Sequence, residues 1–248
     1  GIGVGSGIVT TYIREYRFRL DRVAGGFRRR RGLFTLTDMV MPIHRVQAAI
    51  LRTGPIRSRF GWHHLKFQSL ASDVSGETDH SAAPCAQMHE LKPIFAEANI
   101  EEPADTLVFT GVDAAHWWRT AIAVMMLLSA IGTVNGLFVH PGLFALPLLI
   151  MPIALLMILH WRWHQYGWSE TQLFVRTGWW RRKLTILPIR KVQSVDIDQS
   201  PWDHPLDLAT VTIGVAGGSS MGPLRIHDVP LAMAEAIRTR LLGAISST

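Results

Sequence analysis

The longest apolar segment of the chain lies between Arg119 and Arg162, where 42 consecutive residues include no Asp, Glu, Lys or Arg. A membrane-spanning helix needs about 20 apolar residues, so the segment is long enough for two. The sequence VHPG at 139–142 predicts a tight turn between them. We therefore predict a transmembrane helical hairpin over residues 117–163. The alternative is a helical hairpin buried in a soluble core, which is disfavoured because so long an uncharged run is rare in soluble folds.

Charged and aromatic residues near the ends of this hairpin predict its orientation. Cations flank both outer ends and none lies in the turn, so the positive-inside rule places both ends in the cytoplasm. Tryptophans gather on that same side and predict an aromatic belt at the membrane surface. They are Trp117, Trp118, Trp161 and Trp163. The chain is thus expected to be a multi-pass protein of the cell (inner or plasma) membrane.

Polar and apolar residues alternate with a period of two in short runs on both sides of the hairpin. Examples are YRFRLDR at 16–22 and TVTIGV at 210–215, and such runs separated by Gly and Pro predict antiparallel strands with one solvated face. The chain closes with a predicted helix, capped by Asp228, whose apolar stripe is Leu231, Ala234, Ile237 and Leu241. Before the hairpin, only a short helix is indicated, near Pro93–Glu102.

The two flanks align with each other at a shift of 146 residues. MPIHRVQ at 41–47 falls on LPIRKVQ at 187–193, and Gly32 falls on Gly178. Leu65 and Phe67 fall on Val211 and Ile213. Because the matches are collinear, we interpret the flanks as an internal repeat.

The second copy resembles a bacterial membrane-flanked family whose soluble units are pleckstrin-homology-like (PH-like). The similar segments are GWWRRKLTILPIRKVQSVDIDQSP and LATVTIGVAGG, and the first copy is more weakly similar through RRGLF and MPIHRVQ. The resemblance implies a bent seven-stranded barrel capped by a C-terminal helix. Asp207 stands where the pattern usually has Gly, His204-Pro205 replaces a basic pair, and the first copy has an extra polar loop at 75–84. No activity is carried over from the resemblance, which supports the architecture far more than a mechanism.

The predicted fold is therefore an α+β membrane protein, in which a two-helix transmembrane hairpin separates two PH-like bent β-barrel units with C-terminal helices. The first unit spans 14–110, the hairpin 117–163 and the second unit 164–248. Residues 1–13 carry no charge, and we interpret them as the end of a truncated transmembrane helix.

Each copy places two large apolar residues directly after a hairpin glycine, with cations beside them. These residues are Leu33 and Phe34 in the first copy and Trp179 and Trp180 in the second, and we predict that they insert into a membrane surface. The cations predicted to bind lipid headgroups are Arg28, Arg29, Arg30, Arg31, Arg176, Arg181, Arg182 and Lys183. Basic residues near an acidic leaflet contribute about 1 kcal/mol each.

Other interpretations of these turns remain open. The two tryptophans could pack on the membrane helices or on the other unit, and the cations could form an ordinary solvated face. Residues 14–66 have a net charge of +10, and residues 73–105 have −7. The acidic stretch either folds back on the basic sheet or is a solvated linker. Nucleic-acid binding is disfavoured, since a membrane-tethered unit already has an acidic surface beside it.

Catalytic and metal-binding patterns are missing from the sequence. The 11 histidines include no H-E-x-x-H, and the one cysteine, Cys85, forms no C-x-x-C. We predict no enzyme activity, no metal and no cofactor. The predicted function is that of an adaptor that contacts anionic lipid headgroups or a partner protein through its basic, aromatic-tipped sheets. The alternative is a structural subunit of a membrane complex, or a homo-oligomer, in which the PH-like units mediate assembly.

Overall fold

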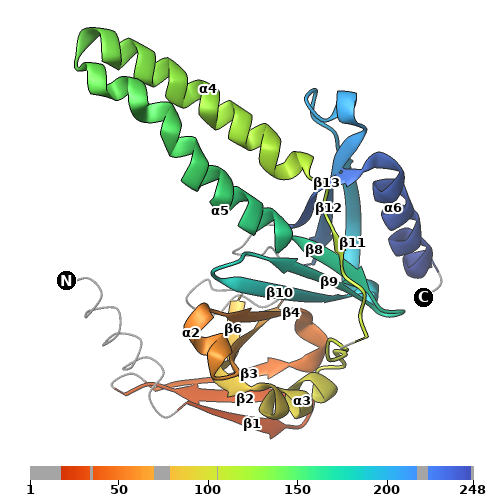
Figure 1. Cartoon of the computed structure of the whole chain (residues 1–248). Coiled ribbons are helices and arrows are strands. Elements are labelled where there is room, and N and C mark those ends of the chain that lie inside the picture. The colour runs from red at the N-terminus through yellow and green to blue at the C-terminus, as the bar shows by residue number, and fades with distance from the viewer. Residues whose placement is uncertain (1–17, 34–35, 70–78, 105, 217–222, 247–248) are drawn as a thin grey trace.

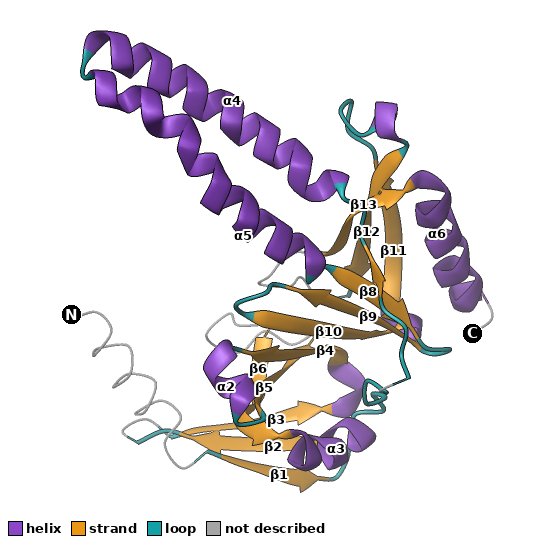
Figure 2. Ribbon diagram, in the orientation of Figure 1, coloured by secondary structure: helices purple, strands orange, loops and turns teal. Residues whose placement is uncertain are grey.

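The computed structural model describes residues 18–33, 36–69, 79–104, 106–216 and 223–246 (Figures 1 and 2). The segment 1–13, which we interpreted as part of a membrane helix, lies outside these residues, as does Phe34. The described residues form three antiparallel sheets, and a long helical hairpin projects away from them (Figure 1).

The described residues before the hairpin form six strands, two α-helices and a 3₁₀ turn. The elements are β1 (Arg19–Val23), β2 (Gly26–Arg31), β3 (Thr37–Pro42), η1 (Ile43–Arg45), β4 (Val46–Thr53), α2 (Pro55–Arg59), β5 (Trp62–Ser69), β6 (Asp79–Gln87) and α3 (Met88–Glu97). A two-residue strand, β7 (Thr110–Gly111), leads into the hairpin helices α4 (Ala115–Phe138), η2 (Pro141–Leu149) and α5 (Ile150–Arg162).

The residues after the hairpin repeat the same plan. The elements are β8 (Gln165–Trp168), β9 (Gln172–Thr177), β10 (Arg182–Pro188), η3 (Ile189–Lys191), β11 (Val192–Asp198), η4 (His204–Leu206), β12 (Leu208–Val215), β13 (Leu224–Pro230) and α6 (Leu231–Ser246).

The internal repeat is confirmed element by element. Strands β2 and β9, the 3₁₀ turns η1 and η3, and strands β5 and β12 each begin and end 146 residues apart. Asp207, which stands where the family pattern usually has Gly, has the same left-handed backbone conformation as its counterpart Gly61. The φ angle is +50° at Asp207 and +67° at Gly61. Asp tolerates this region better than most residues, so the loss of the glycine leaves the turn intact.

The two copies share one sheet. Its strand order is β6-β5-β4-β10-β9-β8-β7, and β4 of the first copy pairs antiparallel with β10 of the second, from Thr53↔Arg182 to Ala49↔Ile186. Strands β1–β3 and β11–β13 form separate three-stranded sheets. Since side chains alternate along a strand, one face of the shared sheet packs into the first core and the other into the second. Ile186 lies in the first core and Leu187 in the second.

Several local predictions differ from the structure. The first copy has six strands among the described residues rather than seven, whereas the second has seven when β7, which pairs with β8, is counted with it. The first helix begins earlier than predicted, at Met88, because Gln87 and Glu90 form a capping box. Residues 79–84 belong to strand β6 instead of a polar loop. Asp228 does not cap α6, because its carboxylate accepts bonds from His116 and Arg119.

The helix α6 buries the predicted stripe. Ala234, Ile237 and Leu241 are almost completely inaccessible and belong to the second core, and Leu231 packs against it. The prediction of an amphipathic closing helix is confirmed.

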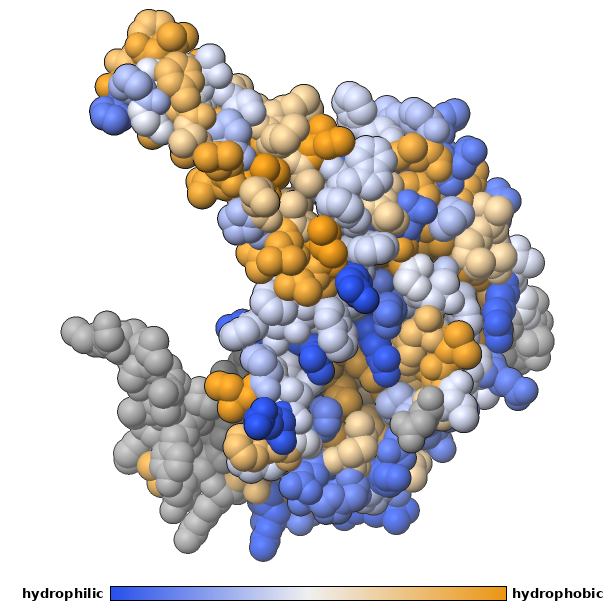
Figure 3. All heavy atoms as spheres, in the orientation of Figure 1, coloured by the Kyte–Doolittle hydropathy of each residue, from blue (hydrophilic) through white to orange (hydrophobic). Residues whose placement is uncertain are grey.

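The hairpin contains two helices long and apolar enough to cross a membrane, Ala115–Phe138 and Pro141–Arg162. Close packing at the turn needs two glycines: a Cβ at Gly132 would lie 2.9 Å from the Leu143 carbonyl oxygen, and one at Gly136 would lie 2.9 Å from the Phe144 ring. Small residues spaced by four allow helix backbones to approach in this way. Most of the hairpin surface is hydrophobic, in contrast to the body (Figure 3).

Candidate functional site

The Trp179-Trp180 pair lies in the turn between β9 and β10. Gly178 has φ +77°, and a Cβ there would lie 2.5 Å from the Arg181 carbonyl oxygen, so this turn requires glycine. The two indole rings form an edge-to-face pair with centroids 5.4 Å apart. Trp180 is 56% exposed, whereas Trp179 is half-buried. The turn thus presents one indole to solvent and holds it against the other.

This turn forms one wall of a cleft that we call the basic cleft, of about 700 Å³. Its other walls come from the end of β4, helix α2, β5 and the last turn of α5. The lining residues are Arg52, Thr53, Gly54, Pro55, Ile56, Arg57, His64, His160, Thr177, Gly178, Trp180, Arg181, Arg182 and Lys183. Among these described residues are five Arg or Lys and no Asp or Glu, so the cleft has a strongly positive potential.

Exposed apolar residues line the basic cleft or follow the segments that line it. Ile56, Phe60 and Trp62 from the first copy are exposed, as is Trp180 from the second. Phe60 and Trp62 form a ring pair with centroids 5.4 Å apart. This group of exposed apolar residues was not predicted from the sequence, because neither helix α2 nor the β4–β10 pairing was expected. A signal was available: Pro55 at a helix start followed by Ile56 and Phe60 at helical spacing.

Arg176 lies apart from the other predicted cations of the second copy. It does not line the basic cleft, because its side chain leaves the opposite face of the shared sheet. Its guanidinium carbon lies 3.5 Å from the centroid of the Phe109 ring. Burial lowers the pKa of Arg176 from its usual value, but a guanidinium stays charged at any physiological pH.

The cations of the first copy are largely engaged by other residues of that copy. Arg28 and Arg30 both bond Asp38, with Arg28 Nε 2.9 Å from Oδ1 and Arg30 Nε 3.1 Å from Oδ2. The hydrogen bond from Arg28 lowers the pKa of Asp38 to about 2. Arg29 is buried and donates to the Ser81 carbonyl oxygen at 3.3 Å. Leu33 is exposed, while the side chain of Arg31 and the whole of Phe34 lie outside the described part of the chain.

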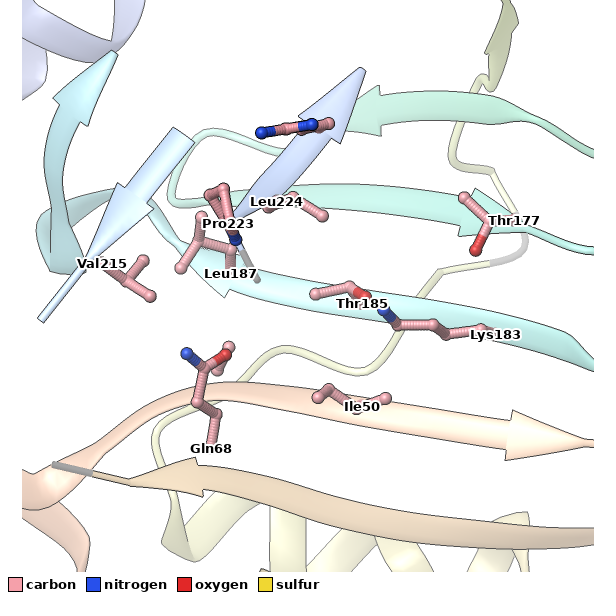
Figure 4. Close-up of a pocket in the computed structure, with 11 residues that line it drawn as sticks. Ile50, Gln68, Thr177, Lys183, Thr185, Leu187, Val215, Pro223 and Leu224 are labelled. Carbon is pink, nitrogen blue, oxygen red and sulfur yellow. The ribbon is translucent and has the colours of Figure 1, made fainter. Parts of the chain in front are cut away.

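A smaller cavity lies on the face of the shared sheet that packs against β12 and β13 (Figure 4). It measures about 90 Å³, and polar groups of Gln68, Thr185 and Lys183 line it with Ile50 and Leu187. Its volume is enough for a few waters and too small for a lipid headgroup. Lys183 lines both this cavity and the basic cleft.

Four histidines meet where the hairpin joins the second copy. His116 of α4 has its ring centroid 5.4 Å from that of His164, 6.0 Å from that of His227 and 6.3 Å from that of His160. We call this group the histidine junction. No three His, Cys, Asp or Glu of the described residues, in this junction or elsewhere, are placed to hold a metal ion. The sequence could not show the junction, because its members lie up to 111 positions apart.

Acidic residues tie the junction to α4. His116 Nδ1 lies 2.6 Å from Asp228 Oδ2, and Arg119 bonds both Asp228 and Asp203. Burial lowers the pKa of His164 to about 3, and burial also lowers that of His227. These contacts fix the base of the hairpin to β13 and to the turn before η4.

Comparison with known proteins agrees with the resemblance noted in the sequence. A family model described as "Bacterial PH domain" matches residues 2–98 and 110–245, one region on each side of the segment between α3 and β7. Neither the comparison with curated proteins nor that with solved structures gives a match.

Proposed function

The chain belongs to the bacterial PH domain family, and from that premise we propose that it is a membrane-anchored adaptor whose basic cleft binds anionic lipid headgroups. Domains of this kind are in general lipid- or protein-binding modules rather than enzymes. In this proposal the hairpin spans the cell membrane and both PH-like units lie in the cytoplasm. The units then comprise residues 14–110 and 164–248, with the hairpin at 117–163.

The observation that supports headgroup binding is the position of the basic cleft. Cations from both copies and the exposed ring of Trp180 gather beside the last turn of α5, where a spanning helix would leave the bilayer. Figure 1 places α2 and the adjoining ends of β9 and β10 together beneath this helix. Five cations near an acidic leaflet would contribute at most about 5 kcal/mol. Because the hairpin tethers the units, a much smaller affinity would keep them docked.

The second copy supports the proposal better than the first. Its Arg181 and Arg182 line the cleft, whereas Arg28 and Arg30 are paired with Asp38. We therefore propose that the second turn, with Arg52 and Arg57 of the first copy, makes the principal headgroup contacts.

The test uses the full chain in lipid nanodiscs, because a separated second copy would expose the β10 edge that β4 covers. A nitroxide is attached to Trp180→Cys in a Cys85→Ser background, and its accessibility to a water-soluble relaxation agent is measured. In anionic discs at low salt, we expect the nitroxide at position 180 to be protected from the relaxation agent. The protection should be lost at high salt, and it should also be lost in the double variant Arg57→Ser/Arg181→Ser. A nitroxide at Arg190→Cys, just past the far end of β10, is the matched control and should stay accessible throughout.

Equal accessibility of position 180 in anionic and zwitterionic discs would contradict headgroup binding. Protection that is independent of both lipid charge and salt would instead favour the alternative, in which the exposed Phe60–Trp62 pair and Trp180 contact a partner protein or a second copy of the chain.

A further inference from the structure

A second cavity, which we call the Trp163 cavity, lies on the opposite face of the same strand ends. It measures about 290 Å³, at the lower limit of typical small-ligand pockets. The lining residues are Leu51, Thr53, His63, Met88, Pro103, Trp163, Arg176, Thr177, Gly178, Arg182, Lys183 and Leu184. The two cavities meet at the ends of the strands, where Thr53, Thr177, Gly178, Arg182 and Lys183 line both. Strand alternation separates the rest of the lining: Leu51, Arg176 and Leu184 line only the Trp163 cavity, and Arg52 lines only the basic cleft.

Positive charge on the Trp163 cavity is not balanced by its lining. Arg176 is half-buried and makes no hydrogen bond or ion pair with any residue in the described ranges, apart from its contact with the Phe109 ring. Arg182 lies with its guanidinium carbon 4.1 Å from the Trp163 ring centroid. No Asp or Glu is present among the described residues that line the cavity. Burying a guanidinium costs free energy unless an anion compensates it, so the site favours an anionic ligand.

A further polar atom in the lining has no partner. Nδ1 of His63 is buried and forms no hydrogen bond within the described part of the structure. Burial lowers the pKa of His63, which keeps the imidazole neutral and able to donate one hydrogen bond. A neutral donor beside two guanidinium groups is suited to the oxygens of a phosphate or carboxylate.

The rest of the cavity wall is apolar. Leu51, Met88, Pro103 and Leu184 supply aliphatic surface, and Trp163 closes the side toward α5. A free phosphate ion would leave this surface in contact with water, whereas a hydrocarbon chain would bury it at a gain of about 0.8 kcal/mol per CH₂. The lining therefore favours a ligand that has both an anionic group and an apolar chain.

We propose that the Trp163 cavity binds an anionic amphiphile: Arg176, Arg182 and His63 bind its phosphate or carboxylate, and Leu51, Met88 and Leu184 contact its chain. The proposed site shares Arg182 with the basic cleft, but Arg176, His63 and Met88 line the Trp163 cavity and not the cleft, so the two sites can be altered separately. It would allow the protein to hold a single amphiphile next to the base of the hairpin.

The experiment is calorimetric titration of the full chain in zwitterionic nanodiscs with hexyl phosphate, inorganic phosphate or hexanol. We expect hexyl phosphate to bind at least ten-fold more tightly than either of the other two. Arg176→Met removes the charge but keeps the stem on Phe109, and it should weaken hexyl phosphate binding at least ten-fold. Arg57→Met, which alters only the basic cleft, should leave the affinity unchanged.

A second variant protects the test against misfolding. Met88→Trp fills the cavity from the start of α3 without altering a charge, and it should also abolish binding of hexyl phosphate. Both variants should keep the protection of a nitroxide at position 180 in anionic discs, which separates this site from the proposed function. Hexyl phosphate binding that is unchanged in both variants would overturn the proposal, and so would inorganic phosphate binding as tightly as hexyl phosphate.

Discussion

The conformation of the turn that holds Trp179 and Trp180 depends on Gly178. Its φ is +77°, and a Cβ added at this position would lie 2.5 Å from the Arg181 carbonyl oxygen, which leaves no room for a side chain. Gly178→Ala should therefore cost about 1–3 kcal/mol of stability, measured as the free energy of unfolding in urea. Gly54→Ala is the matched control, because Gly54 has φ −117° and nothing within 4 Å of an added Cβ. If both substitutions lowered the free energy of unfolding equally, the turn would not require glycine at position 178.

At the residue scale, the sequence predicted which aromatic and basic residues lie at the turns, but it did not predict which residues they contact. The alignment of Gly32 with Gly178 indicated two hairpin turns, and both glycines do have positive φ. No pattern in the sequence indicated that Asp38 would pair with Arg28 and Arg30, because that pairing depends on the register of β2 on β3. The sequence also could not place Arg176 on the same face as Leu184 and opposite to Lys183, since that depends on the register of β9 on β10.

Among the elements, the hairpin and the closing helix could be predicted, because each has a long periodic or uncharged pattern. Short elements could not: α2 has five residues, and its boundary depends on the neighbouring strands. Pairing between strands of different copies was also hidden, since no local pattern in β4 or β10 shows which edge another strand will cover. The basic cleft follows from that pairing, so the sequence identified only one of its walls.

The histidine junction between α4, α5 and β13 should make stability depend on pH. His164 is buried and has a pKa of about 3 in the native state, compared with about 6.5 when unfolded. Between these values the unfolded chain binds a proton that the native chain does not, so stability falls as the pH falls from about 6.5 toward 3. The slope from this one group is at most about 1.4 kcal/mol per pH unit.

The measurement is the urea midpoint of the full chain in neutral detergent between about pH 7.5 and pH 5, a range that spans the unfolded pKa of histidine. We expect a decrease in the wild-type protein and a smaller decrease in His164→Leu, which has no group to protonate at this position. His227→Gln should reduce the slope as well, because burial lowers the pKa of His227 too. If the urea midpoint changed equally with pH in all three proteins, the histidine junction would not be the source of the pH dependence.

In the whole molecule, the shared sheet makes the two copies a single structural unit. Phe174 and Ile186 come from the second copy but lie in the first core, and Ala48 comes from the first copy but lies in the second core. Each core thus includes residues from both copies. A duplication is commonly expected to give two independent domains, but the β4–β10 ladder joins them, and one copy should not unfold while the other stays native.

Two equivalent core positions allow a test of this coupling. Phe67 of β5 and Ile213 of β12 occupy the same place in the repeat, and each is fully buried in its own core. Phe67→Ala should cost about 3–5 kcal/mol, and through the shared sheet it should lower the stability of both copies. Hydrogen exchange of peptides from β5 and β12 under mild denaturant should show similar losses of protection in this variant.

Ile213→Ala provides the reciprocal measurement, with an expected cost of about 2–5 kcal/mol. If the shared sheet couples the copies, it too should reduce protection in β5, although Phe67 lies on the other side of that sheet. If each variant lost hydrogen-exchange protection only in the mutated copy, the β4–β10 ladder would be able to open while the other copy stays folded. The basic cleft, whose walls come from both copies, would then open at that ladder, and headgroup binding would stabilise the ladder against denaturant.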